Sequence, residues 1–328
     1  MTRKNLLTAV RDALHDEMAQ DERIVLLGED VGARGGVFRL SDGWLEEFGP
    51  ERVIDTPLAE SGLVGVAIGM ALHGLLPVAE IQFADFIHPA YDQIVSEAAR
   101  IRYRSNGDFA CPLVIRTPCG GGVHGALYHS QSIEATYAHV PGLKVVMPST
   151  PADAAGLLRS ALRDPDPVLF LEHKRAYRAV TGDVPDDYAT TPIGRADVKR
   201  GGTDLSVITY GYEVHRCLEA AERLDADGVS AEVVDVRTLA PLDVETILAS
   251  VRRTSKAIVV YEDNRTYGAG AEIAATIAEH AFDDLDAAVV RIGGPDVPAM
   301  PFASPLEHAF LEPAPDRLFH AMRDLAAA

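Results

Sequence analysis

One carboxylate, Glu60, stands at the start of an apolar run in which Gly65 and Gly69 recur. Glycine lowers helix stability, so glycines within a helical run predict that something packs closely against that face. The aromatic residues Phe83 and Phe86 follow the next predicted strand. An acid beside aromatic rings is a candidate for proton transfer, because apolar surroundings shift its pKa. The alternative is that Glu60 only complements the dipole of the helix that it begins.

Two histidines, His124 and His129, follow a glycine-rich turn. Histidine is the side chain best suited to move a proton near neutral pH. One of the two could instead cap a helix or satisfy backbone groups. Their spacing does not place both on one helical face, and no cysteine or carboxylate beside them completes a metal site.

The turn itself, from Gly120 to Gly125, matches G-x-G-x-x-G directly after a predicted strand. Such a turn can bind a dinucleotide, but the next strand ends in Pro148 and Ser149 and offers no acid to hold a ribose. Backbone passing close to a ligand or to a neighbouring chain explains the glycines better. A stand-alone nicotinamide-dependent oxidoreductase remains an alternative.

The segment from Ala161 to Asp166 ends a predicted helix with prolines and acids. Free carbonyl groups at a helix C-terminus, together with nearby carboxylates, can hold a cation. A helix stop followed by a turn is the more common explanation.

These residues lie among alternating strands and helices. Continuous apolar segments separated by helical ones are typical of a parallel sheet with helices on both faces. Strands are predicted at residues 24–28, 52–55, 78–82, 113–117, 143–147 and 168–172, and again at 205–210, 231–236, 257–261 and 288–292. The predicted helices include residues 3–19 and a long one over residues 89–104.

Residues 182–202 are rich in proline, glycine and charge and lack periodicity, as a linker does. We therefore predict an α/β protein with two doubly wound domains, residues 1–185 and 204–328, joined by a linker at 186–203.

The composition limits the partners and the compartment. A net charge of -19 argues against nucleic acid and anionic membranes as partners. The acidic, lysine-poor composition fits either a high-salt cytoplasm or a high-GC genome. Three scattered cysteines predict buried thiols in a reducing cytoplasm. No secretory signal precedes Asn5, and Pro77 interrupts the longest apolar run, which favours a core helix and strand over a membrane span.

Ordered matches along nearly the whole chain resemble the beta subunit of the thiamine-diphosphate-dependent decarboxylating dehydrogenase component of 2-oxo acid dehydrogenase complexes. They include GEDVGARGGVF (28–38), RVIDTPLAESG (52–62), AEIQFADF (79–86), HGALYHSQS (124–132), RDPDPVLFLE (163–172) and DVRTLAPLD (235–243). The resemblance implies an N-terminal pyrimidine-binding domain for thiamine diphosphate and a C-terminal domain similar to that of transketolase.

By this resemblance, Glu60 hydrogen-bonds N1′ of the aminopyrimidine of thiamine diphosphate. A carboxyl that exchanges a proton there promotes the tautomer that removes the thiazolium C2 proton. The resemblance places Phe86 against the pyrimidine ring, and Gln82, on the same strand end, is expected to line the site.

The resemblance gives His129 and the segment after residue 160 separate roles. His129 matches the family histidine of reductive acylation, in which a proton must reach the lipoyl disulfide as it opens. Five positions match a potassium site of some relatives: Leu113, Ala161, Leu162, Asp164 and Asp166. Because that site is built largely from backbone oxygens, an aspartate at position 166, where asparagine is commoner, need not abolish it.

The resemblance also implies partners. The family assembles as two alpha and two beta chains, with thiamine diphosphate at the alpha/beta interface and its diphosphate and magnesium held by the alpha subunit. This sequence accordingly lacks Gly-Asp-Gly followed by a downstream asparagine. The second domain is expected to serve in subunit assembly and in docking the lipoyl acyltransferase core.

The segment HGALYHSQS is more similar to the branched-chain members of the family than to the pyruvate members. The expected reaction is therefore oxidative decarboxylation of a 2-oxoisovalerate-type substrate, with pyruvate and acetoin as alternatives. A subunit kept only for assembly is the alternative from a different class. Tyr267 stands where relatives often have glycine.

Overall fold

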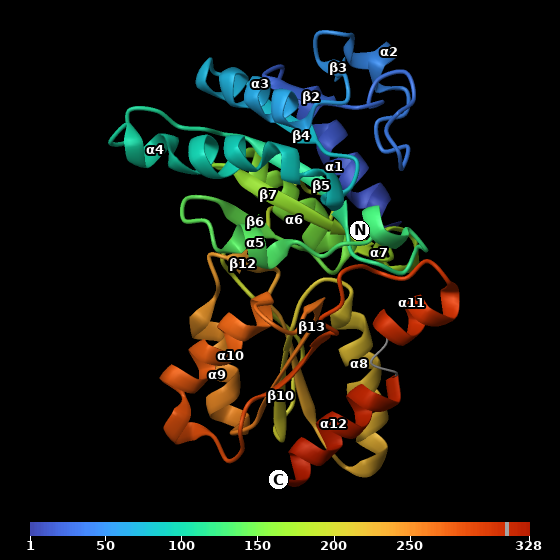
Figure 1. The fold of residues 1–328 in the computed structure, drawn as a ribbon, viewed down its shortest axis with the longest axis vertical. Coiled ribbons are helices and arrows are strands. Elements are labelled where there is room, and N and C mark those ends of the chain that lie inside the picture. Colours follow the sequence, from blue (N-terminus) through green and yellow to red (C-terminus); the bar gives the residue numbers. More distant parts are fainter. Residues whose placement is uncertain (312–314) are drawn as a thin grey trace. The chain divides into compact units, whose positions relative to one another are not determined.

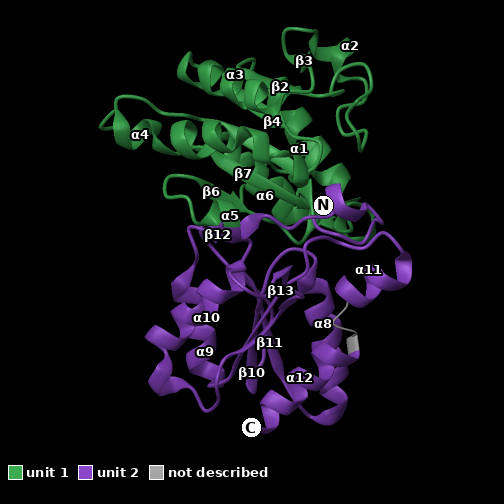
Figure 2. Ribbon diagram, in the orientation of Figure 1, with its two compact units in different colours: residues 1–119, 136–193 green, residues 120–135, 194–328 purple. Residues whose placement is uncertain are grey.

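The computed structural model of the chain describes residues 1–311 and 315–328. It divides into two compact units (Figure 2). The first unit contains residues 1–119 and 136–193, and the second contains residues 120–135 and 194–328.

This division differs from the predicted domains in two places. Residues 120–135 belong to the second unit, although the sequence placed them within the first domain. Part of the expected linker is a strand, β9 (Asp197–Arg200), which pairs antiparallel with a strand of the second unit. Both differences arise from long-range contacts, which the local composition of the chain does not reveal.

The first unit is built on parallel strands in the order β6-β7-β5-β4-β2-β3. These strands are β2 (Ile24–Gly28), β3 (Val53–Asp55), β4 (Leu76–Glu80), β5 (Val114–Cys119), β6 (Lys144–Val146) and β7 (Val168–His173). Every residue of β2, β5 and β7 is buried, as expected for strands with helices on both faces. A separate antiparallel pair joins β1 (Thr2–Asn5) to β8 (Thr181–Val184).

The helices of the first unit begin with α1, which Asn5 caps by accepting a hydrogen bond from the Thr8 backbone N–H at 2.8 Å. The helices are α1 (Leu6–Gln20), α2 (Trp44–Phe48), α3 (Glu60–Leu72), α4 (Ile101–Arg104), α6 (Pro151–Leu162) and α7 (Ala176–Ala179), and α5 (Glu134–Ala138) spans the boundary between the units. The predicted helix over residues 3–19 thus begins three residues later, after β1.

The predicted helix over residues 89–104 is not one continuous α-helix. A π-helical turn at Gln93–Glu97 and a 3-10 turn at Ala98–Arg100 precede the short α4. Apolar periodicity reports that a segment is helical but not which hydrogen-bond spacing it uses.

The glycine face of α3 is open within the described chain, so the close packing predicted for it is not provided by these residues. A Cβ atom added at Gly69 would meet nothing within 4 Å, and one at Gly65 would meet only Cγ of Gln93 at 3.9 Å. Val66 and Leu72 are 56% and 42% exposed. The helix therefore presents a smooth apolar surface that the described residues of this chain do not cover.

The second unit has the strand order β14-β13-β10-β11-β9, parallel except for β9. Its remaining strands are β10 (Leu205–Thr209), β11 (Ala231–Asp235), β12 (Thr238–Ala240), β13 (Ala257–Asn264) and β14 (Val290–Gly294). Its helices are α8 (Glu213–Leu224), α9 (Val244–Thr254), α10 (Ala269–His280), α11 (Ser304–Leu311) and α12 (Pro315–Ala327). Helices α8 and α12 cover one face of the sheet and α9 and α10 the other (Figure 1). The predicted α/β class with two doubly wound domains is confirmed.

Two further observations bear on the sequence predictions. Tyr267 has φ of 60°, in the left-handed region that glycine adopts more readily than other residues. Within residues 1–311 and 315–328, no helix combines the length and apolar character needed to cross a membrane.

Candidate active site

The site begins where the chain changes direction in the first sheet. Strands β2 and β4 are neighbours, but the chain continues from β2 to β3 on one side and from β4 to β5 on the other. In open α/β sheets, ligands bind outside the carboxyl ends of the strands at such a switch point. The residues just beyond these ends meet, because Nε2 of Gln82 donates to the backbone oxygen of Glu29 at 3.4 Å.

Glu60, the first residue of α3, lies close to this edge. Burial raises the pKa of Glu29, and the charges of Glu60 and Asp30 raise it further. The Glu60 carboxylate is therefore close enough to Glu29 for the two charges to interact. Glu60 is 8% exposed, and among the described residues no hydrogen bond or ion pair engages its carboxylate. A nearly buried acid without a partner is suited to bind a polar group of a ligand.

Aromatic rings line the chain beyond β4. The rings of Phe83 and Phe86 meet edge to face with their centroids 5.7 Å apart, and Phe38 meets Phe83 at 5.9 Å. Phe86 is half-buried. Glu60 and Gln82 are thus both linked to Glu29, and Phe86 lies four residues after Gln82 on the segment that follows β4.

A buried ion network lies within the three strands β4, β5 and β7, and the sequence reasoning missed it. Nε and Nη2 of Arg116 each lie 2.7 Å from an oxygen of Glu172, and Nη1 pairs with Glu80. The Tyr177 hydroxyl donates to Glu172 at 2.8 Å. Burial raises the pKa of Glu80, and the Arg116 charge opposes that shift. The available signal was one charged residue inside each of three apolar strands.

The two candidate histidines have different surroundings in the second unit. Nδ1 of His124 lies 2.5 Å from Oε2 of Glu307, so this ring contacts a buried carboxylate. His129 is half-buried and follows a 3-10 turn at Ala126–Tyr128. The role of His129 in proton transfer remains a prediction from the resemblance. Glu60 and His129 belong to different units.

The glycine-rich turn does not offer a dinucleotide site. A pyrophosphate would need free backbone N–H groups. Here the Gly121 N–H donates to Oε1 of Glu262 at 2.8 Å, and the Gly122 N–H donates to Oε1 of Glu307 at 3.0 Å. These carboxylates occupy the donors, which argues against nicotinamide binding at this turn. Neither acid could be predicted from the sequence, because both are distant from the turn along the chain.

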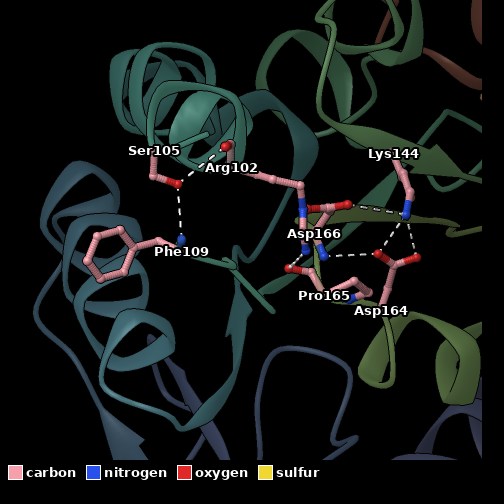
Figure 3. Close-up of polar contacts among 7 residues, drawn as sticks. All are labelled: Arg102, Ser105, Phe109, Lys144, Asp164, Pro165 and Asp166. Atoms are coloured by element: carbon pink, nitrogen blue, oxygen red, sulfur yellow. Dashed lines mark hydrogen bonds and ion pairs between the residues drawn. The ribbon is translucent and has the colours of Figure 1, made fainter. Parts of the chain in front are cut away.

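The acids expected near potassium are paired with basic side chains (Figure 3). Nζ of Lys144 lies 2.6 Å and 2.7 Å from the two oxygens of Asp164, while Asp166 pairs with Nε of Arg102. The Asp164 and Asp166 carboxylates are therefore not open to a metal. In the part of the chain that the structure describes, no group of three or more histidine, cysteine, aspartate or glutamate residues could hold a metal ion.

The other three positions contribute backbone groups. The carbonyl of Leu113 accepts from the Val168 N–H at 2.9 Å, and that of Ala161 accepts from the Asp164 N–H at 3.2 Å. Leu162 ends α6, two residues before Asp164. A cation at this place would have to be held by backbone carbonyl oxygens, since the side chains do not fit one.

Comparison with known proteins places both units. Residues 3–180 match the transketolase pyrimidine binding domain, and residues 194–317 match the transketolase C-terminal domain. The 2-oxoisovalerate dehydrogenase subunit beta of Bacillus subtilis (strain 168) is 57% identical over 99% of this chain and 99% of that protein. The pyruvate dehydrogenase E1 component subunit beta of the same organism is 50% identical over 92% of this chain and 93% of that protein.

A solved structure supports the same placement. It is a split gene transketolase described as an inactive beta4 tetramer, with a TM-score of 0.78 and 26% identity over 98% of each chain. The fold, the carboxylate at the switch point and the full-length sequence similarity agree. The chain therefore belongs to the family of thiamine-diphosphate-dependent 2-oxo acid dehydrogenase beta subunits, built from a transketolase pyrimidine-binding domain and a transketolase C-terminal domain.

Proposed function

We propose that this chain is the catalytic beta subunit of an enzyme that oxidatively decarboxylates a branched-chain 2-oxo acid of the 2-oxoisovalerate type. The observation that carries the proposal is the nearly buried Glu60 carboxylate, which lacks a partner in the described chain and lies close to the switch point of the first sheet. The branched-chain preference rests on the higher identity to the 2-oxoisovalerate relative, 57% against 50%.

The residues at this edge fit the aminopyrimidine end of thiamine diphosphate. When bound, this cofactor supplies a nucleophilic carbon that adds to the 2-oxo group and accepts the electrons left by the departing carboxylate. Glu60 holds and exchanges a proton at the pyrimidine N1′. Phe86 packs against the ring and excludes water, while the bond from Gln82 to the backbone oxygen of Glu29 orients the Gln82 side chain.

His129 is proposed to act after decarboxylation, when the acyl group passes to a lipoyl dithiolane. A carbon–sulfur bond forms as the sulfur–sulfur bond breaks, and the sulfur that leaves takes a proton. An imidazole can hold that proton near neutral pH and deliver it.

Partners follow from the open surfaces of the chain and from the family. The exposed apolar face of α3, with Gly69 uncovered, is suited to close packing against an alpha subunit. We propose a tetramer of two alpha and two beta chains, in which the alpha subunit holds magnesium and the cofactor diphosphate. The second unit is proposed to dock the lipoyl acyltransferase core. Three buried cysteines among the described residues fit a cytoplasmic enzyme.

Potassium near Leu113 and the end of α6 remains a prediction from the resemblance. Lys144 and Arg102 already neutralise the Asp164 and Asp166 carboxylates. An ion bound there would therefore be held by backbone carbonyl oxygens alone.

Glu60→Gln in the chain co-expressed and purified with its alpha subunit tests the catalytic proposal. Glutamine keeps the shape of the side chain but cannot exchange a proton, so turnover should fall at least ~100-fold while the subunits still co-elute. Turnover is measured with thiamine diphosphate, magnesium and an artificial electron acceptor, comparing 3-methyl-2-oxobutanoate with pyruvate. Glu51→Gln, at an exposed glutamate of the same unit, is the matched control.

The outcomes separate the alternatives. Unchanged turnover by an assembled Glu60→Gln enzyme would show that the chain serves assembly and not catalysis. Faster turnover of pyruvate by the wild-type enzyme would keep the mechanism and overturn the branched-chain preference.

A further inference from the structure

Glu307 holds the turn that precedes His129. This residue of α11 is fully buried, at 0% exposure. Its Oε1 accepts the backbone N–H of Gly122 at 3.0 Å and that of His124 at 3.1 Å, while Oε2 lies 2.5 Å from Nδ1 of His124. One buried carboxylate thus receives two backbone donors and one imidazole, and charge-assisted bonds of this kind are the strong ones.

Helix α11 is itself fixed to the second unit. Nη1 of Arg216, on α8, donates to the backbone oxygen of Leu311, the last residue of α11. Leu311 also packs against the turn, because a Cβ added at Gly121 would lie 2.8 Å from its Cδ1. The helix that carries Glu307 is therefore held in place by contacts with α8 and with the turn.

A second carboxylate holds the two ends of the same loop. Oε1 of Glu262 accepts the Gly121 N–H at 2.8 Å and the Ser132 hydroxyl at 3.2 Å. His129 lies between these two attachment points. The segment that carries His129 is thus closed at its ends by Glu262 and supported along its first half by Glu307.

The turn held by Glu307 touches the backbone of His129 directly. A Cβ added at Gly125 would lie 2.6 Å from the backbone oxygen of His129 and 2.8 Å from its Cβ. His124 and Ala126 both have φ of 57°, a left-handed conformation that non-glycine residues adopt at an energetic cost. Such a conformation persists only where contacts enforce it, and the bonds to Glu307 are the contacts at His124.

We propose that Glu307 is a positioning residue that sets the location of His129 through the 122–125 turn. The proposal rests on the proposed role of His129 in reductive acylation. Because Glu60 belongs to the other unit, loss of Glu307 should slow transfer to the lipoyl group and leave decarboxylation nearly unchanged. A small displacement of a proton donor is enough to cost a large factor in rate.

The test uses Glu307→Ala and Glu307→Gln in the enzyme assembled with its alpha subunit. Glutamine retains one acceptor oxygen for the two backbone N–H groups, whereas alanine retains none. Reductive acylation of a lipoyl domain should therefore fall at least ~10-fold in the alanine variant and less in the glutamine variant. Decarboxylation of 3-methyl-2-oxobutanoate with an artificial acceptor should stay within about 2-fold of the wild type. Glu245→Ala, at an exposed glutamate whose side chain is 87% accessible, is the control.

Hydrogen exchange measured by mass spectrometry supplies a readout that does not depend on activity. Amides in peptides covering residues 121–128 should exchange at least ~10-fold faster in Glu307→Ala than in the wild type or the control. If the alanine variant does not fold, the glutamine variant carries both measurements.

His129→Ala distinguishes failure of this inference from failure of the proposed function. If His129→Ala acylates the lipoyl domain at the wild-type rate, the proposed role of His129 is wrong. If His129→Ala is impaired but the Glu307 variants acylate normally, the positioning role of Glu307 is wrong. Equal losses in both half-reactions of the Glu307 variants would also overturn it, since they indicate a general structural defect.

Discussion

Arg116→Met removes the guanidinium that joins two acids in the interior of the first unit. Arg116 makes two bonds of 2.7 Å to Glu172 and a further ion pair to Glu80. All three side chains are at most 6% exposed. Methionine fills a similar volume without charge, so the substitution leaves two buried carboxylates without a cation.

The expected loss of stability follows from the protonation that the folded variant would need. A glutamate has a pKa of about 4.3 in the unfolded chain, so keeping one carboxyl neutral at about pH 7 costs ~3.7 kcal/mol, at ~1.36 kcal/mol per pH unit. This agrees with the ~3–5 kcal/mol typical of a buried ion pair that loses one partner. We therefore expect the free energy of unfolding of the first unit to fall by about 4 kcal/mol.

The pH dependence of this loss has a definite sign. Burial already raises the pKa of Glu80, and removal of Arg116 raises it further. A carboxyl with a raised folded pKa destabilises the folded state increasingly as pH rises above the unfolded value, until pH passes the folded pKa. The loss of unfolding free energy in the variant should therefore be smaller by ~2.7 kcal/mol at about pH 5.5 than at about pH 7.5. This value corresponds to one carboxyl at ~1.36 kcal/mol per pH unit over ~2 pH units.

Urea unfolding followed by the fluorescence of Trp44 measures this deficit. Trp44 is the one tryptophan of the chain, lies in the first unit and is 1% exposed. The control is Arg104→Met, because Arg104 and Glu97 form an exposed pair with 64% and 46% accessible side chains, worth at most ~1 kcal/mol. A deficit below ~1 kcal/mol for Arg116→Met, or one that is equal at both pH values, would falsify the reasoning. Adding Glu80→Gln and Glu172→Gln should restore most of the stability, since no buried charge then remains in the network.

Two further predictions concern the second unit and potassium. Burial, and then the charge of Asp263, raise the pKa of Glu134 to about 8, so Glu134 destabilises the fold increasingly as pH rises from about 4.5 to about 8. Glu134→Gln should therefore stabilise the chain by ~3 kcal/mol at about pH 7. Thermal unfolding at several pH values from about 5 to about 8 measures this gain. A stability difference between variant and wild type that does not change with pH would refute the prediction. If potassium binds the backbone carbonyls near Ala161, potassium chloride should raise the unfolding midpoint above that in equal sodium chloride. Identical midpoints would remove potassium from this site.

The sheets were predictable from the sequence because buried parallel strands are continuous apolar runs. Residues 24–28 were predicted as a strand, and β2 occupies the same residues. The assignment of residues 120–135 to the second unit was not predictable. Backbone N–H groups of this segment donate hydrogen bonds to Glu262 and Glu307 of that unit. Both acids lie well over one hundred residues away along the chain. Local pattern carries no information on contacts of that range.

The buried ion network shows the same limit at a smaller scale. Glu80, Arg116 and Glu172 stand in predicted strands, so the sequence shows three charges in apolar surroundings. Their pairing depends on strand order, because β5 lies between β4 and β7 while β6 lies beyond β7. Only that order places Arg116 between the two acids. The sequence reveals the charges, and the topology of the sheet determines their partners.

The two groups proposed for chemistry have separate supports, which has a consequence for their energetics. Glu60 begins a helix of the first unit, in which Arg116 and its acids join β4, one of the two switch-point strands, to β5 and β7. His129 lies on a loop that Glu262 and Glu307 hold to the second unit. Substitutions at sites that share no partner usually contribute additively to free energy. Decarboxylation and transfer to the lipoyl group can therefore be tuned independently within one chain, because substitutions around either support leave the contacts of the other intact.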